Sequence, residues 1–132
     1  MKKLFLLATI ALGVAVISCN KDQQAVKKLD GSWEEVSIDG TAVPDSSKGT
    51  LTFESCKLKN DTYCNATYTY SDGDKEDYTY KVSGKGTTLS MKYEDPNFGS
   101  FELISTIDEL TKEKLVITTT FFDTWTTEYK KK

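Results

Sequence analysis

Residues 76–93 read EDYTYKVSGKGTTLSMKY, and this stretch decides the fold class. Tyr78, Tyr80 and Val82 alternate with polar residues, and the alternation resumes at Leu89 after a glycine-rich segment. A period of two places alternate side chains on one face of a β-strand, whereas a helix repeats every 3.6 residues. Glycine accepts the positive φ values that tight hairpin turns require. The stretch therefore predicts two antiparallel strands joined by a short turn.

The same pattern continues along the chain after Leu29. Thr, Tyr, Val, Ile and Phe recur in short runs separated by Gly, Asn, Asp and Ser clusters, which is typical of strands and turns. The predicted strands lie near 31–38, 49–56, 63–70, 76–82, 87–93, 100–108, 114–120 and 124–130. No stretch reads as a long amphipathic helix that could cover an open sheet, so closure best removes the exposed edges. We expect an all-β, eight-stranded antiparallel up-and-down barrel, with a β-sandwich as the alternative.

The N-terminus has the three-part layout of an export signal. Residues 1–3 read MKK, residues 4–17 are almost unbroken apolar sequence, and the small residue Ser18 precedes Cys19. The ending Val16-Ile17-Ser18-Cys19 resembles the lipobox of bacterial lipoproteins. The resemblance implies cleavage after Ser18 and a lipid on Cys19, which would anchor the protein to the outer membrane, facing the periplasm or the cell surface. An ordinary secreted protein with a free Cys19 is the alternative.

The segment that follows is polar and shows no hydrophobic period. We expect it to be a tether between the lipid and the folded domain. The predicted organisation is therefore a signal peptide at 1–18, a lipidated cysteine and polar tether at 19–28, and one barrel domain at 29–132.

Charge and composition exclude several functions. All 17 basic residues of the chain are lysines, and it has no histidine. Without residues 1–18 it carries 15 lysines and 20 acidic residues, a formal charge of −5, so we expect no nucleic-acid partner. The commonest general base and metal ligand, histidine, and the forked carboxylate clamp of arginine are both missing. We therefore expect no catalytic residue, no metal, no cofactor and no enzyme activity.

The start of the first predicted strand carries a family resemblance. Gly31-Ser32-Trp33 resembles the Gly-x-Trp signature of lipocalins, in which the tryptophan plugs the closed end of the barrel. The order of the later strands is also similar to that of the small lipocalin-like domains of bacterial lipoproteins. The resemblance implies that Gly31 and Trp33 are structural. Lipocalins usually pack an arginine over this tryptophan, and here Lys130 or Lys131 could replace it as a cation–π partner.

Two cysteines fall within the predicted domain. A three-residue turn between their strands would place Cys56 opposite Cys64, within disulfide range, and export to an oxidising compartment permits the bond. A two-residue turn would instead pair Phe53 with Tyr68, which suits the core but misaligns the cysteines. We predict a disulfide, with a β-bulge near the end of the hairpin that reconciles the two registers.

The tyrosine-rich inward face and the lipocalin resemblance favour a non-enzymatic binder of a small apolar or amphipathic ligand. Strand parity gives five candidate ligand contacts, which are Phe53, Tyr68, Tyr80, Met91 and Phe101. The alternative is a protein-binding module, such as a hydrolase inhibitor or a component of a surface complex. The acidic stretch 72–77 could attract a basic protein partner by electrostatic steering.

Overall fold

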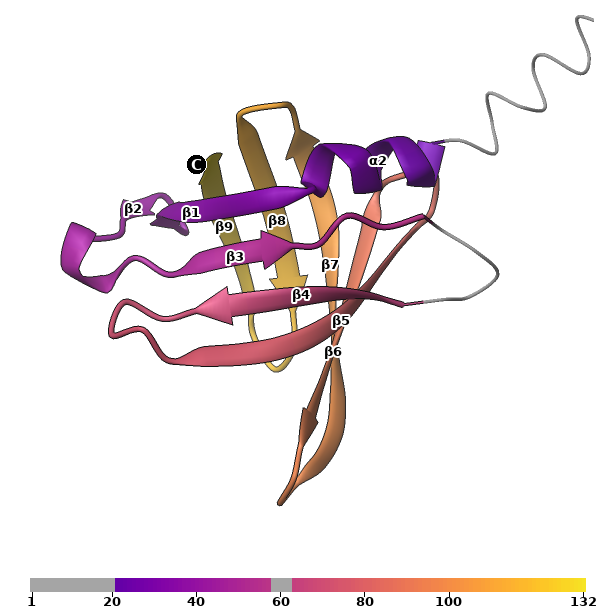
Figure 1. Ribbon diagram of the computed structural model, residues 1–132. Helices are drawn as coiled ribbons and strands as arrows, with labels where there is room; N and C mark the ends of the chain where they lie inside the picture. The colour runs from indigo at the N-terminus through magenta and orange to yellow at the C-terminus, as the bar shows by residue number, and fades with distance from the viewer. Residues whose placement is uncertain (1–20, 58–62) are drawn as a thin grey trace, which may run out of the picture.

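The strands follow one another around the molecule in nearly the order of the chain. The computed structural model describes residues 21–57 and 63–132. Its strands are β1 (Gly31–Ile38), β2 (Thr41–Ala42), β3 (Thr50–Phe53), β4 (Cys64–Thr69), β5 (Lys75–Ser83), β6 (Thr88–Asp95), β7 (Gly99–Leu110), β8 (Lys114–Thr120) and β9 (Thr124–Lys131). They form one antiparallel sheet in the order β2-β1-β3-β4-β5-β6-β7-β8-β9, and β9 also pairs with β1 (Figure 1).

The pairing of β1 with β9 closes the sheet and decides between the two expected architectures. Trp33 lies opposite Lys131, and Ile38 lies opposite Thr127. The eight-stranded up-and-down barrel is thereby confirmed, and the sandwich is wrong because a sandwich would leave these two strands in separate sheets. The short strand β2 is an addition that pairs with the end of β1 and is followed by a 3₁₀ turn, Asp45–Ser47.

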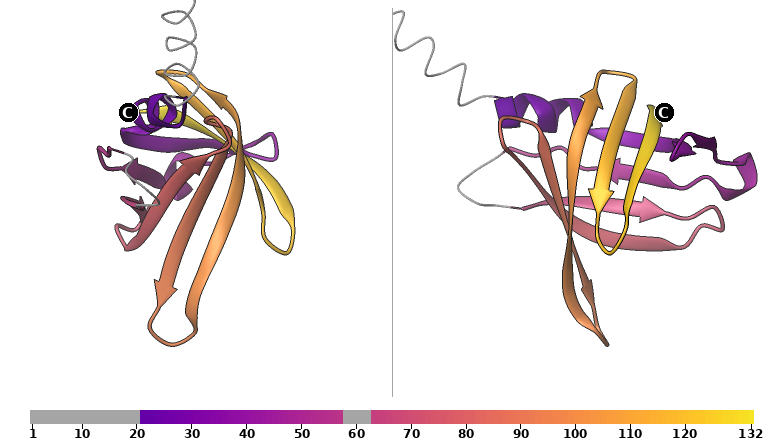
Figure 2. Two further views of the ribbon diagram at one scale, coloured as in Figure 1. Left: turned by 90° about the vertical axis from the view of Figure 1, so that its right-hand side faces the viewer. Right: turned by 180° about the vertical axis from the view of Figure 1, so that it is seen from behind.

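The hairpin predicted from residues 76–93 is the β5–β6 pair. Tyr80 lies opposite Met91 and Val82 opposite Leu89, so the apolar residues of both strands share the inner face. The connecting turn places Gly84, Lys85 and Gly86 at positive φ. Further out, β6 and β7 continue together beyond the other strands as a projecting hairpin (Figure 2).

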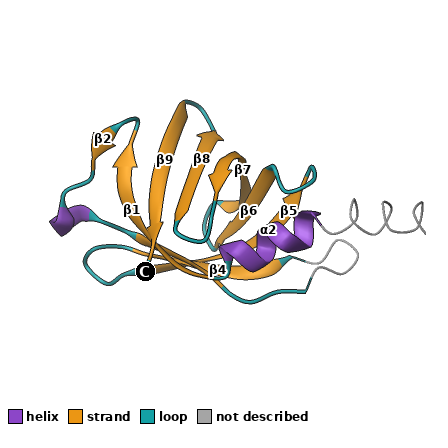
Figure 3. Cartoon of the chain, turned by 90° about the horizontal axis from the view of Figure 1, so that it is seen from above, coloured by secondary structure: helices purple, strands orange, loops and turns teal. Residues whose placement is uncertain are grey.

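A helix, α2 (Lys21–Leu29), lies across one end of the barrel and contacts β5 and β7 (Figure 3). Its apolar residues Ala25, Val26 and Leu29 are buried in the same core as Trp33. At its first turn, the Asp22 carboxylate accepts a hydrogen bond of 2.6 Å from the Gly86 amide in the β5–β6 turn. The expectation of a tether at 19–28 is therefore wrong from Lys21 onward, because this segment has apolar surface that closes the barrel.

The predicted disulfide between Cys56 and Cys64 is confirmed, with the two Cα atoms 6.0 Å apart. The predicted strand register is wrong. Leu51 pairs with Tyr68, and Phe53 pairs with Ala66. The end of the hairpin, where the bulge is predicted, includes residues 58–62, which lie outside the described residues. Cys56 lies beyond the end of β3, so it reaches Cys64 from a non-strand segment instead of from a paired strand position.

Residues 1–18 and Cys19, which carry the predicted export signal and lipid, lie outside the described residues. Across 21–57 and 63–132, no helix has the length and apolar character needed to cross a membrane.

Candidate functional site

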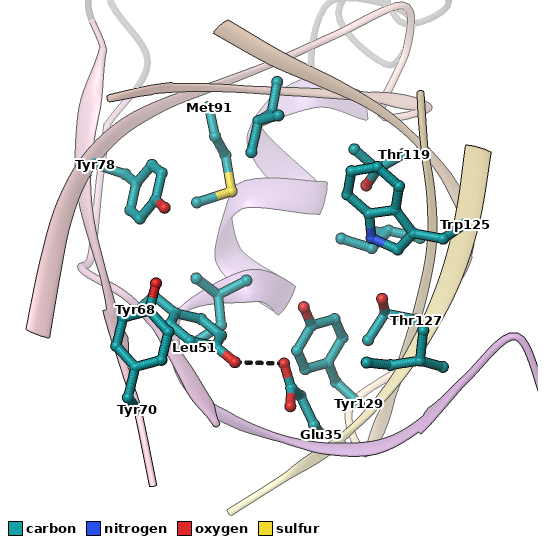
Figure 4. A pocket seen from close by; sticks show the side chains of 13 residues that line it. Glu35, Leu51, Tyr68, Tyr70, Tyr78, Met91, Thr119, Trp125, Thr127 and Tyr129 are labelled. Carbon is teal, nitrogen blue, oxygen red and sulfur yellow. Dashed lines mark hydrogen bonds between the residues drawn. The ribbon is translucent and has the colours of Figure 1, made fainter. Parts of the chain in front are cut away.

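The barrel holds a cavity of about 270 Å³ at the end away from α2. β1 runs from Gly31, next to the helix, to Ile38 at the cavity mouth. The lining side chains are Glu35, Ile38, Leu51, Tyr68, Tyr70, Tyr78, Met91, Leu103, Ile117, Thr119, Trp125, Thr127 and Tyr129 (Figure 4). The site is therefore built from residues of every strand of the barrel, β1 and β3 to β9.

The cavity has a buried floor and an open rim. Leu51, Met91 and Ile117 form apolar parts of the floor and are buried. Ile38 and Tyr70, by contrast, are 40% and 42% exposed and lie at the rim. Apolar walls with a few polar groups are typical of sites for small organic molecules.

Glu35 brings a carboxylate to the cavity wall, although its side chain is only 7% exposed. The Tyr68 hydroxyl donates to Glu35 Oε1 at 2.6 Å (Figure 4). The Gly49 amide donates to Glu35 Oε2 at 3.1 Å. The register of β1 against β9 shifts at this point, between Glu35 and Ser37. Such a bulge changes the direction of a side chain relative to its neighbours.

Gly49 leaves the space that this arrangement requires. A Cβ atom at position 49 would lie 1.9 Å from the Tyr68 hydroxyl oxygen, which is far inside the contact distance. Any other residue here would displace the hydroxyl from Glu35. Gly49 therefore supplies an amide donor, and its lack of a side chain leaves room for the Tyr68 hydroxyl.

The hydroxyl groups around Glu35 are held in their protonated form. Burial, followed by the hydrogen bond to Glu35, raises the pKa of Tyr68 well above its usual value. Burial and the charge of Glu35 likewise raise the pKa of Tyr129, whose ring lies beside Glu35 (Figure 4). Both tyrosines are neutral hydrogen-bond donors at physiological pH.

The opposite end of the barrel is plugged by Trp33. Its indole Nε1 donates to the Leu29 carbonyl of α2 at 2.7 Å, and the ring has no exposed surface. The Lys131 ammonium lies 4.5 Å from the centre of the Trp33 ring and donates to the carbonyls of Lys28 and Asp30. Of the two lysines expected to replace the lipocalin arginine, Lys131 is the one over the ring.

Gly31 lies beneath the same lysine. It has φ +112°, and an added Cβ would meet Lys131 Cε at 3.0 Å. Glycine is needed here both for the backbone conformation and for the close approach of the lysine stem. The glycine, the plugging tryptophan and the cation over its ring together close this end of the barrel, as the Gly-x-Trp resemblance implies.

Comparison with known families agrees with this geometry. The lipocalin-like domain family matches residues 29–117. The chain belongs to that family. No curated protein matches the chain.

The lipocalin-like barrel brings together two of the five ligand contacts expected from strand parity. Tyr68 and Met91 line the cavity. Phe53 and Tyr80 lie deeper, fully buried, and pack edge to face with ring centres 5.0 Å apart. Phe101 lies on the β6–β7 hairpin and is 38% exposed. Phe53 and Tyr80 therefore fill the interior of the lipocalin-like barrel, and Phe101 lies outside the cavity lining.

Phe101 belongs instead to a row of neighbouring rings packed at tilted or edge-to-face angles, here called the aromatic strip: Tyr78, Tyr93, Phe101, Phe121 and Phe122. Successive ring centres are 4.6–6.0 Å apart. The strip begins at Tyr78 in the cavity wall and ends at Phe122, which is 96% exposed. It extends the inner face of the lipocalin-like barrel beyond the mouth.

Glu35 was not among the residues expected at the site, although the sequence contains a signal for it. It lies two positions after Trp33 on the same strand, so period two places it on the inner face. Glu34 faces the outside and forms ion pairs with Lys48 and Lys132. Within the described part of the chain, no group of three or more Cys, Asp or Glu side chains could hold a metal ion.

Proposed function

We propose that this protein is a membrane-anchored lipoprotein whose lipocalin-like barrel binds a small amphipathic ligand without catalysing a reaction. The observation that carries the ligand-binding part is the cavity of about 270 Å³, in which apolar walls surround a few convergent polar groups. An engineered cavity of about 150 Å³ is large enough to bind benzene. A ligand with one ring and a short polar arm therefore suits this volume.

Native mass spectrometry of the protein from residue 20 onward, purified without denaturation, tests the ligand-binding part. The expected result is a retained small molecule in the native protein. Met91→Trp should remove it by filling the cavity, whereas Ser90→Trp, on the other face of β6, should retain it. A clean protein mass, together with no binding of small aromatic molecules by titration, contradicts the proposal.

The anchoring part rests on the lipobox-like sequence before Cys19. Growth with a labelled fatty acid should mark the full-length protein and place it in the membrane fraction. Cys19→Ser should abolish both, and Cys56→Ser should leave the label unchanged. Unlabelled wild-type protein in the soluble fraction would rule out the anchor.

A second candidate function, binding to a protein, is favoured by the exposed end of the aromatic strip. Phe122 is 96% exposed and Phe98, at the tip of the projecting hairpin, is 88% exposed. Large aromatic side chains in contact with water are characteristic of interaction surfaces. Asp72 and Asp74 lie in the neighbouring β4–β5 turn, and Glu76 and Asp77 follow at the start of β5. These carboxylates could steer a basic partner towards the mouth.

A photo-crosslinking residue at position 122 tests this candidate in intact cells. A defined protein adduct is expected from position 122 and none from Glu102, an exposed position on β7 outside the strip. Equal labelling from both positions would count against a specific docking surface.

A further inference from the structure

Among residues 21–57 and 63–132, no basic side chain pairs with the buried carboxylate of Glu35. Its two hydrogen bonds come from neutral donors, Tyr68 and the Gly49 amide. The lysine ion pairs in the described residues are made with other carboxylates, namely those of Glu34, Asp45, Glu109 and Glu128. A charge removed from water costs free energy unless an opposite charge compensates it. The cavity therefore has a negative group whose counter-charge the described part of the chain does not supply.

The walls around this carboxylate are aromatic. The rings of Tyr68, Tyr70, Tyr78, Trp125 and Tyr129 all line the cavity (Figure 4). The face of an aromatic ring is negative and attracts ammonium groups, most strongly where water is excluded. No lysine is among the lining residues, which all belong to the described part of the chain.

The entrance carries the same sign of charge. The Tyr78 hydroxyl donates to Glu76 Oε2 at 2.7 Å, so a second carboxylate lies next to a ring of the wall. Asp72, Asp74 and Glu76 border a neighbouring surface pocket with Tyr70, against a single lysine, Lys75. A negative entrance raises the local concentration of cations and lowers that of anions.

From these three observations, and on the basis of the proposed ligand-binding function, we infer that the ligand is an organic cation, such as an aromatic or alkyl amine. The ammonium group lies against Glu35 and the tyrosine rings. The apolar part of the ligand lies against Leu51, Met91 and Ile117. The cavity selects for charge because its lining, as far as the chain is described, offers one carboxylate and no lysine.

Isothermal titration with three probes that share a 2-phenylethyl group tests the inference. The probes are 2-phenylethylamine, 2-phenylethanol and 3-phenylpropanoate at pH 7 and low salt. The amine is expected to bind at least about tenfold more tightly than the alcohol, which corresponds to about 1.4 kcal/mol. The carboxylate probe is expected to bind more weakly than the alcohol.

Variants assign the preference to Glu35. Glu35→Gln should bring the amine and the alcohol to equal affinity, whereas Glu34→Gln, on the outer face of the same strand, should leave the tenfold preference unchanged. Tyr68→Phe provides a second test if Glu35→Gln does not fold. It keeps the ring and the carboxylate and removes the hydroxyl that occupies Oε1, so the affinity for the amine should be equal or higher.

The outcomes separate the inference from the function on which it rests. Equal binding of the amine and the alcohol to the wild-type protein overturns the inference and leaves ligand binding intact. An amine preference that survives Glu35→Gln also overturns it. Binding of none of the three probes counts against both the cation preference and the ligand-binding function for molecules of this size.

Discussion

At the scale of the residue, Tyr80 makes the stability of the folded protein depend on pH. It has no exposed surface, and its hydroxyl donates to the Glu54 carbonyl at 3.0 Å. Burial raises its pKa to about 12. Between the unfolded value near 10 and this folded value, the unfolded state loses a proton that the folded state keeps, so stability falls as pH rises.

Denaturant unfolding at pH 8 and pH 12 should show this loss. One pKa unit corresponds to about 1.4 kcal/mol, and at pH 12 the folded-state hydroxyl is itself half ionised, so Tyr80 alone accounts for a decrease of about 2 kcal/mol in the free energy of unfolding between these pH values. Lysines also titrate in this range, so the control is Tyr80→Phe, which should be less stable at pH 8 and should lose less on going to pH 12. Equal losses in both proteins would contradict the assignment to Tyr80.

The lysine over Trp33 gives a second prediction at this scale. Lys131 combines a cation–π contact at 4.5 Å with hydrogen bonds to two carbonyls at the end of α2. Lys131→Ala should lower the free energy of unfolding by about 1–2 kcal/mol, measured by denaturant titration. Lys130→Ala, one residue away and exposed, should change it by less than about 0.5 kcal/mol. Similar losses for both variants would show that Trp33 does not need the cation.

Residue patterns predicted much of the interior and less of the cavity. Alternation identified buried Leu51, Leu89 and Leu115 because a strand has only two faces. Alternation does not show how deep along the barrel axis a residue lies. Tyr80 and Met91 were therefore equal candidates for ligand contacts, although only Met91 lines the cavity. Glu35 was missed because an acidic residue on an inner face conflicts with the rule that charges stay in water.

At the scale of the element, α2 shows what a composition-based expectation overlooks. Its sequence KDQQAVKKL is mainly polar, and only Ala25, Val26 and Leu29 are apolar. Three residues are too few for a helical period to stand out in the sequence. Their burial becomes evident only when the closed end of the barrel offers a surface to cover.

Leu29→Ala tests the contribution of this helix. Leu29 has no exposed surface, so the substitution should destabilise the protein by about 2–5 kcal/mol. Lys27→Ala, in the same turn and exposed, serves as the control and should have little effect. Thermal unfolding followed by circular dichroism measures both. If Leu29→Ala lowers the stability only slightly, the helix does not stabilise the barrel and the segment is a tether after all.

The Cys56–Cys64 bond connects the segment after β3 to the start of β4. Closing this short loop should stabilise the fold by roughly 2.5 kcal/mol by the chain-entropy argument. The double substitution of both cysteines by serine should lower the midpoint of denaturant unfolding accordingly. Reductant should destabilise the wild-type protein and leave the double variant unaffected; sensitivity of both to reductant would point to another cause.

At the scale of the whole molecule, stability depends on one closing pair of strands. β9 bonds to β8 on one side and to β1 on the other. Removing residues 124–132 should abolish cooperative unfolding and promote aggregation, because two strands would then have unpaired edges. Replacing the tip of the projecting β6–β7 hairpin should leave the unfolding transition cooperative. Calorimetry and size-exclusion chromatography would distinguish the two cases.

The position of α2 also bears on how the proposed ligand would arrive. The helix begins two residues after Cys19, and two extended residues reach only about 7 Å. A lipid on Cys19 would therefore hold the plugged end near the bilayer, and the mouth would face away from it. The proposed ligand would then enter the barrel from the aqueous compartment instead of sideways from the membrane, and this route would suit a small amine that dissolves in water.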